Sequence, residues 1–269
     1  MSVDLEDYFC DLPFSEWKNY KSRIEKTTKQ ILELFDKHHV RATFFTLGYI
    51  AENFPDLIKQ IHEKGHELAS HSYSHLDLRK VTKKEFEEDF LKSIKAIEKI
   101  TGEKVLGFRA PFFSINQNNF WVFDVLRKYV KYDSSIFPVK TPQYGFSRAP
   151  TKFYHPSQKN ILKEDEEETF MEIPPLTYHL LGYNLPVAGG FYFRFFPYFL
   201  IKRGIISFMK KNFPTMFYIH PKDLDPEMPK IKGYSWHYYY GKKNIMKKFE
   251  SLLTEFSFSS VKEVFFDTK

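Results

Sequence analysis

The chain has 269 residues, of which 42% are hydrophobic and 28% are charged, so it is long and apolar enough to bury a sizeable core. Its net charge of +6 is spread along the chain rather than gathered in arms, which argues against nucleic-acid binding. Weak attraction to an anionic membrane surface or an acidic glycan stays open. A single cysteine, Cys10, excludes an internal disulfide and is consistent with a reducing compartment.

The first ten residues, MSVDLEDYFC, lack the basic region followed by an apolar run that marks a signal peptide. We therefore expect a cytoplasmic protein, unless the native start lies upstream. The most aromatic stretch, residues 191–201, is far shorter than the roughly 20 residues that cross a membrane. We expect no transmembrane segment, and this stretch is a candidate interfacial or lid segment.

Strand-like and helix-like runs alternate along the chain, which is typical of a parallel sheet covered by helices. Strands are predicted at residues 2–4, 41–47, 66–70, 105–109, 131–137 and 215–220. Helices are predicted at residues 15–39, 53–64, 82–100, 118–130, 196–212 and 242–255. The third helix has the clearest start, because Thr82 followed by Glu85 forms a capping box. Residues 256–266 are predicted to close the sheet.

Regular patterning fails between residues 138 and 186, where proline and polar residues are frequent. We interpret the region around residues 138–195 as an irregular insertion within a single domain of residues 1–269. The first predicted strand is shorter than the usual length of about five or six residues. Either the native start lies upstream or the sheet is open at that strand.

Polar side chains gather at or just after the ends of four predicted strands. These are Asp4, Glu6 and Asp7, then His71 and His75, then Arg109, and finally His220. The carboxyl ends of parallel strands meet at one edge of the sheet, where α/β folds build their sites. Each cluster taken alone is also explained by ordinary caps and turns.

His71 and His75 are four residues apart, so on a helical turn both imidazoles share one face and can bind one metal ion. The competing interpretation is two solvated histidines in a loop. Two histidines and one carboxylate leave an open position on zinc for water, whose pKa the metal lowers. A second carboxylate would then accept the proton of that water, and a histidine across the pocket would protonate the leaving amine.

Five stretches carry a family resemblance, and they occur in this order: SVDLEDYF, RATFFTLGYIAENFPDLIKQIHEKGHELASHSYSHLDL, GFRAPFFS, YDSSIFP and MFYIHP. With them the chain resembles the polysaccharide deacetylases related to nodulation-factor and chitin deacetylases, a carbohydrate esterase type. Later stretches, such as AGGFYFRFFPYFL and HYYYGKKNIMKKFESLL, resemble a subgroup found in bacterial exopolysaccharide loci. The resemblance implies an α/β fold, a distorted (β/α) barrel with about seven parallel strands.

The resemblance also implies a role for each motif residue. Asp4 matches the catalytic base, Arg109 the arginine that holds that base, His71 and His75 the metal ligands, Phe112 the donor of an oxyanion-hole N–H, Asp133 the carboxylate that tunes the acid, and His220 the general acid. The cofactor implied is a divalent metal, with zinc as the first choice. Arg109 as a structural ion-pair partner, Asp133 as a turn cap and His220 as a core histidine are the simpler alternatives.

The first motif departs from the common family form, which has two adjacent aspartates, because Leu5 follows Asp4. We expect Glu6 to be the metal ligand instead, with Asp7 as its competitor. Alternation along a strand favours Glu6, since residues i and i+2 share a face.

The sequence therefore predicts a metal-dependent hydrolase that removes N-acetyl groups from an N-acetylated sugar or polysaccharide precursor. Two alternatives stay open. One is hydrolysis of another C–N bond or of an O-acetyl ester by the same machinery. The other is a glycan-binding protein that has the fold without the activity.

Overall fold

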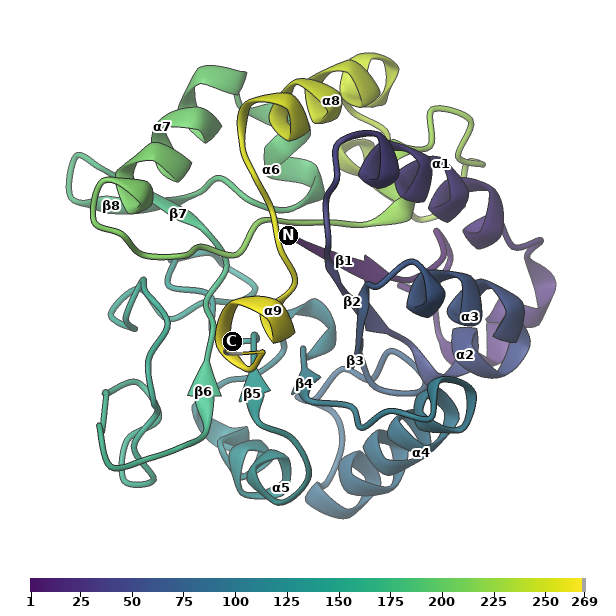
Figure 1. Ribbon diagram of the computed structural model, residues 1–269. Helices are drawn as coiled ribbons and strands as arrows, with labels where there is room; N and C mark the ends of the chain where they lie inside the picture. The colour runs from purple at the N-terminus through teal and green to yellow at the C-terminus, as the bar shows by residue number, and fades with distance from the viewer. Residues whose placement is uncertain (268–269) are drawn as a thin grey trace.

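The computed structural model describes residues 1–267, and its centre is a seven-stranded parallel sheet with the strand order β6-β5-β4-β3-β2-β1-β9. The strands are β1 (Ser2–Leu5), β2 (Thr43–Thr46), β3 (Glu67–Ser70), β4 (Gly107–Phe108), β5 (Tyr132–Asp133), β6 (Met171–Glu172) and β9 (Tyr218–Ile219). The sheet curls into an incomplete barrel with helices on its outer side (Figure 1). This confirms the predicted distorted (β/α) barrel.

The helices that surround the sheet follow the predicted order. They are α1 (Ile24–Lys37), α2 (Gly48–Asn53), α3 (Pro55–Glu63), α4 (Lys83–Thr101), α5 (Trp121–Tyr129), α6 (Gly190–Phe195), α7 (Tyr198–Met209), α8 (Ile245–Glu255) and α9 (Val261–Phe265). Short 3-10 turns lie at Phe14–Asn19, Pro111–Phe113, Gln117–Asn119, Pro221–Leu224, Trp236–Tyr238 and Lys242–Asn244. The capping box predicted at the start of α4 is present, because Thr82 and Glu85 bind each other's backbone N–H. No helix within residues 1–267 is long and apolar enough to cross a membrane.

The gap in the barrel lies between β6 and β9, the two edge strands. There a single parallel bridge joins Pro175 to Met216, and the Leu176 N–H donates to the Met216 carbonyl at 2.7 Å. The first strand is paired on both sides, with β2 and with β9, although it has only four residues. The prediction that the sheet is open at the first strand is therefore wrong.

Residues 256–266 do not add a strand, which corrects the prediction that they close the sheet. They form a loop and then α9, which covers the amino-terminal end of the barrel (Figure 1). The backbone N–H groups of Val261 and Lys262 donate to the side chains of Thr43 (2.8 Å) and Glu67 (2.9 Å), the first residues of β2 and β3. The opposite, carboxyl-terminal end of the barrel is left for a site.

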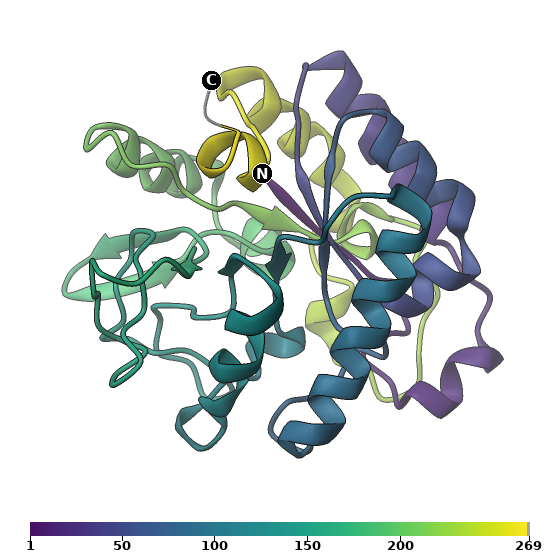
Figure 2. The same ribbon diagram turned by 60° about the horizontal axis from the view of Figure 1, so that its bottom comes forward.

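The region predicted to be irregular supplies one edge of the sheet through β6. It also forms an antiparallel hairpin of β7 (Thr177–Leu180) and β8 (Tyr183–Pro186), which projects at the left of Figure 2. Residues 138–170 between β5 and β6 contain no helix or strand of their own. A strand as short as β6 has no alternating pattern that a sequence could show.

Candidate active site

A cavity of about 500 Å³ opens at the carboxyl-terminal ends of the strands. Six of the predicted site residues line it, namely Asp4, Glu6, His71, His75, Phe112 and His220. Arg109 and Asp133 are not part of the lining and are fully buried beneath it. The loops that follow β1, β3, β4 and β9 therefore bring residues more than 200 positions apart into one pocket.

Glu6, His71 and His75 each offer one ligand atom, and these atoms lie within 4.8 Å of one another. The Nδ1 atom of His71 lies 2.7 Å from the Arg109 carbonyl, and that of His75 lies 2.9 Å from the Cys10 carbonyl. A carbonyl oxygen only accepts, so each Nδ1 carries the hydrogen and each Nε2 presents a lone pair. Such backbone acceptors commonly orient metal-binding histidines.

Glu6, His71 and His75 thus bring three hydrogen-bond acceptors together, with no hydrogen-bond donor among them. The His75 Nε2 faces Glu6 Oε2 at 2.6 Å, and no hydrogen-bond donor for this buried oxygen is found within residues 1–267. Burial lowers the pKa of His71 to about 4, so that imidazole is neutral near pH 7. A cation between the three groups would satisfy all of them, and their nitrogen and oxygen donors fit a divalent metal.

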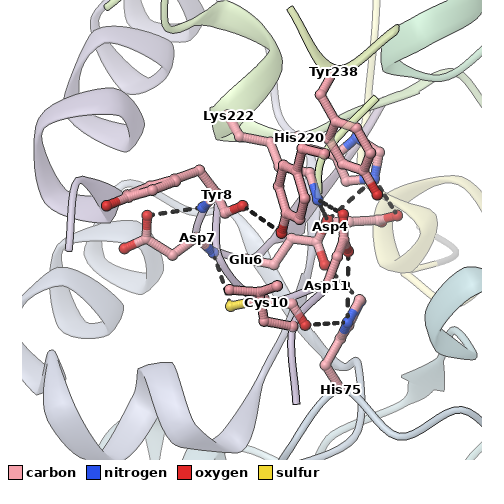
Figure 3. A network of polar contacts seen from close by, with 12 residues as sticks. Asp4, Glu6, Asp7, Tyr8, Cys10, Asp11, His75, His220, Lys222 and Tyr238 are labelled. Carbon is pink, nitrogen blue, oxygen red and sulfur yellow. Dashed lines mark hydrogen bonds and ion pairs between the residues drawn. The ribbon is translucent and has the colours of Figure 1, made fainter. Parts of the chain in front are cut away.

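Asp7, the competing ligand, points away from this cluster (Figure 3). Its carboxylate accepts hydrogen bonds from the backbone N–H groups of Arg23 (3.0 Å) and Ile24 (3.3 Å) and from the Ser22 hydroxyl. These donors lie at the start of α1, where a helix leaves its N–H groups unpaired. Asp7 therefore caps that helix. The single helix predicted at residues 15–39 is in fact a 3-10 turn (Phe14–Asn19) followed by α1 (Ile24–Lys37).

Asp4 is held by Arg109, as the resemblance implies. Its Oδ1 accepts from an Arg109 guanidinium nitrogen at 2.5 Å, while Oδ2 faces the pocket at 3.6 Å from His220 Nε2. The guanidinium also donates to Ser2 Oγ at 3.0 Å and to the carbonyl and hydroxyl of Ser134 at 3.1 and 2.8 Å. A fully buried guanidinium with four such acceptors fixes one carboxylate oxygen and leaves the other free.

The carboxylate beside His220 is Asp223, not Asp133. The His220 Nδ1 lies 2.7 Å from Asp223 Oδ2, and Arg194 contacts the other carboxylate oxygen at 3.2 Å. Burial alone would lower the pKa of His220, but the carboxylates around it, Asp223 first and then Glu6 and Asp4, outweigh burial and raise the pKa. Sequence reasoning missed Asp223, although its position three residues after His220 is that of a residue that caps a short turn.

Asp133 instead supports the loop that carries Phe112. It accepts from the Ser135 hydroxyl at 2.6 Å, and the Ser135 oxygen in turn accepts from the Ala110 N–H at 2.7 Å. Burial raises the pKa of Asp133 to about 6 and raises that of its buried neighbour Glu172 well above the usual value. Asp133 and His220 have no hydrogen bond or ion pair with each other among the described residues, so a role of Asp133 in tuning the acid stays a prediction.

Two further charged residues that sequence reasoning missed complete the pocket. The Lys222 ammonium lies 2.7 Å from Glu6 Oε1 and 2.9 Å from Asp11 Oδ2 (Figure 3). Burial disfavours a charge on Glu6, but the Lys222 ammonium, its strongest favourable partner, holds the pKa of Glu6 well below its usual range. In the sequence, Lys222 and Asp11 look like surface residues of turns, and only the fold shows that they meet.

Comparison with protein families divides the chain into two matched parts. Residues 14–127 match the model of the polysaccharide deacetylases, and residues 134–266 match a domain of unknown function, DUF3473. Similar proteins include a peptidoglycan-N-acetylglucosamine deacetylase of Bacillus cereus, 36% identical over 34% of this chain and 33% of its own length. A peptidoglycan deacetylase of Helicobacter pylori is 36% identical over 40% of this chain and 36% of its own. The chain spans about a third of the length of these relatives.

Solved structures resemble the whole chain. A Mycobacterium smegmatis protein assigned to the polysaccharide deacetylases has a TM-score of 0.65 at 15% identity, covering 98% of this chain and 87% of its own. The Puue allantoinase has a TM-score of 0.59 at 14% identity, covering 98% and 81%. At this identity the structures show a shared fold alone. The likeness to the exopolysaccharide subgroup stays a prediction. From the matched model, the similar sequences and the ordered motifs, the chain belongs to the polysaccharide deacetylase family.

Proposed function

We propose that the protein is a metal-dependent hydrolase that removes N-acetyl groups from an N-acetylated glycan. The observation that carries the proposal is the meeting of Glu6, His71 and His75 as three acceptors, beside one free oxygen of Asp4 and the Nε2 of His220. The similar deacetylases of peptidoglycan support a glycan as the substrate class.

Glu6, His71 and His75 would hold the metal, and zinc fits two imidazoles and one carboxylate. When bound, the metal would polarise the acetyl carbonyl and lower the pKa of a water molecule. Both histidines are already oriented by the backbone carbonyls that accept from Nδ1, so little reorganisation would accompany binding.

The other residues would manage the protons of the hydrolysis. Water adds to the acetyl carbon, and Asp4 Oδ2 accepts its proton, because Arg109 occupies the other carboxylate oxygen. The C–N bond then breaks, and His220 Nε2 donates a proton to the leaving nitrogen, yielding acetate and a free amine. Asp223 holds the Nδ1 hydrogen and favours the charged imidazolium from which that proton comes.

Phe112 would donate its backbone N–H to the oxyanion that develops on the carbonyl oxygen. Its backbone has a left-handed conformation with φ of 59°, and its ring packs 4.4 Å from that of His75. Strained backbone of this kind is found where a loop must present a group to a site. Asp133, through Ser135 and Ala110, would hold the loop in this position.

We also propose that residues 1–269 form one catalytic domain with an irregular insertion. The pocket lining supports this, because His71 and Phe112 come from the first matched part and Tyr144, Arg194 and His220 come from the second. A cytoplasmic location stays a prediction.

The proposal is tested by acetate release from N-acetylated oligosaccharides and peptidoglycan fragments with zinc present. Wild-type protein should release acetate, and Asp4→Asn and His75→Ala should each lose at least about 100-fold in kcat/KM. His62→Ala, at a partly exposed histidine outside the pocket, is the matched control and should keep full activity. Equal rates for His62→Ala and His75→Ala would reject the assignment.

A further inference from the structure

Exposed aromatic side chains form a cluster beside the pocket. Phe195, Trp236 and Tyr240 are 47%, 63% and 45% exposed. Phe191 contacts Phe195 and Trp236 at centroid distances of 5.4 and 5.8 Å, and Tyr240 contacts the same two rings at 5.9 and 5.6 Å. Phe191 also lines the pocket, so the cluster begins at the pocket wall. We call Phe191, Phe195, Trp236 and Tyr240 the aromatic rim.

Hydrogen bonds from two basic side chains to backbone carbonyls, rather than burial of the rings, hold the aromatic rim in place. The guanidinium of Arg194 in α6 donates to the carbonyls of Tyr238 and Tyr240 at 3.0 and 2.8 Å, which joins the two segments that carry the rings. The ammonium of Lys248 in α8 donates to the carbonyls of Phe193 and Phe196. A rigidly positioned group of exposed large apolar rings marks an interaction surface.

The two segments that build the aromatic rim contain lysines and arginines but no carboxylates, although Asp223, Asp225 and Glu227 lie in the turn between them. Residues 173–222 contain six lysines and arginines and no aspartate or glutamate, and residues 228–249 repeat this composition. These two segments hold 12 of the 40 basic residues, so the rest of the chain has 28 basic against 34 acidic residues. The positive charge is therefore gathered in these segments, which corrects the expectation that it is spread along the chain. Figure 1 shows their helices α6, α7 and α8 next to one another.

Several of these charges are available to a partner. Lys230, Lys232 and Lys243 are exposed on the loop that carries Trp236 and Tyr240. Among the described residues, none of the three lysines forms a salt bridge with a carboxylate, whereas Lys84 on α4 and Lys104 in the loop after α4 both do. The rim thus combines amphipathic rings with unpaired positive charge.

We propose that the aromatic rim and its three neighbouring lysines dock the protein on an anionic lipid bilayer, with the pocket beside the membrane surface. Tryptophan and tyrosine favour the interface between water and lipid, and each lysine near an anionic surface adds about fivefold to the partition coefficient. A glycan site would combine such rings with carboxylates that accept from sugar hydroxyls, and these segments have none. If the proposed deacetylation is right, a glycan on a membrane lipid would have direct access to the pocket.

The test is flotation of the full chain with vesicles of phosphatidylcholine, alone or mixed with phosphatidylglycerol. We expect binding to the mixed vesicles that weakens with salt, and little binding to phosphatidylcholine alone. Lys230→Glu combined with Lys232→Glu should lower the partition coefficient at least about 25-fold. Phe195→Ala combined with Trp236→Ala should lower it roughly tenfold, because rings that would enter the lipid are lost.

Matched controls come from the region of α4 and α5, which lies across the barrel from α6 and α8 (Figure 1). Lys84→Glu with Lys104→Glu alters side chains that are 86% and 83% exposed, and Tyr129→Ala removes an exposed ring from α5. These changes should leave vesicle binding unchanged. Absence of binding to any vesicle, or equal losses in controls and rim variants, would overturn the proposal.

An acidic glycan is the competing partner. If the rim variants lose binding to a soluble acidic polysaccharide while no vesicle is bound, the rim is a glycan site and the membrane proposal is wrong. Acetate release from soluble oligosaccharides should stay unchanged in the rim variants, because Phe195, Trp236 and the two lysines lie outside the pocket lining. Vesicle flotation thus tests the membrane proposal, and acetate release tests the proposed reaction, independently of each other.

Discussion

Replacing Gly190 with alanine should disable His220 without touching it. Gly190 is the first residue of α6, and a Cβ atom there would lie 1.6 Å from Asp223 Oδ2 and 2.0 Å from its Cγ. Non-bonded contacts of a Cβ essentially never fall below 3.0 Å, so the carboxylate would have to retreat by about 1.4 Å or more. His220 Nδ1 at 2.7 Å and Arg194 at 3.2 Å hold that carboxylate where it is.

A displacement of this size takes the hydrogen bond between Asp223 and His220 out of range. Loss of a hydrogen bond to a charged group costs about 1.5–3 kcal/mol of stability. The imidazole then loses the group that fixes its tautomer and direction, and we expect kcat to fall by about 10²–10⁴-fold with a smaller change in KM. The assay is steady-state acetate release, with thermal unfolding measured on the same samples.

Gly102→Ala is the control for the Gly190→Ala substitution. No atom lies within 4 Å of a Cβ at Gly102, but its φ of +70° is strained for alanine, so it loses stability without a clash in the pocket. Its kcat should stay within about twofold of wild type, since it touches no site residue. Full activity of Gly190→Ala, or equal losses in both variants, would refute the role given to Asp223.

Three further predictions concern groups that support the pocket. An acidic group whose pKa is raised in the folded state makes the protein less stable as pH rises through that pKa, and the Asp133 and Glu172 pair should show such a loss near pH 6. Glu172→Gln should reduce this loss of stability and stabilise the protein at pH 7–8 by about 1–3 kcal/mol. The measurement is thermal unfolding as a function of pH. Asp7→Ala should lower the free energy of unfolding in urea by about 1 kcal/mol, because α1 loses its cap. Zinc affinity measured by calorimetry should not change, and a large loss of affinity would make Asp7 a ligand again. Lys222→Met should destabilise the metal-free protein by about 3–5 kcal/mol, because the buried Glu6 carboxylate loses its cationic partner. Zinc should then raise the melting temperature of this variant more than that of wild type. An equal rise in both proteins would count against Glu6 as a ligand.

Much of the site could be predicted because its residues follow strands whose order sets where they meet. Parallel strands place the residues at the carboxyl ends of β1, β3 and β9 at one end of the barrel, and Asp4, His71 and His220 all line the pocket there. The expected choice of Glu6 over Asp7 agrees with the structure, but not through strand alternation, because both residues lie in the turn after β1; Glu6 faces His71 and His75, and Asp7 faces the start of α1.

The residues that sequence reasoning missed depend on contacts with no local signal. Lys222 pairs with Asp11 across 211 positions, and Glu172 reaches Asp133 through a two-residue strand without a pattern. Asp133 contacts Ser135, and Asp223 contacts His220, which the motifs could not show because they give the identity of a carboxylate but not the direction of its side chain. The closing strand was misjudged because Val261 is buried, and Phe265 and Phe266 are partly buried, against the barrel end from a short helix rather than from a strand.

Anomalous diffraction from a crystal grown with zinc tests the central claim most directly. We predict one strong peak within bonding distance of Glu6, His71 and His75. Asp4 should lie outside the ligand shell, with Oδ1 accepting a hydrogen bond from Arg109 and Oδ2 free. A pocket without a peak, or a metal held by Asp7 in place of Glu6, would contradict this prediction.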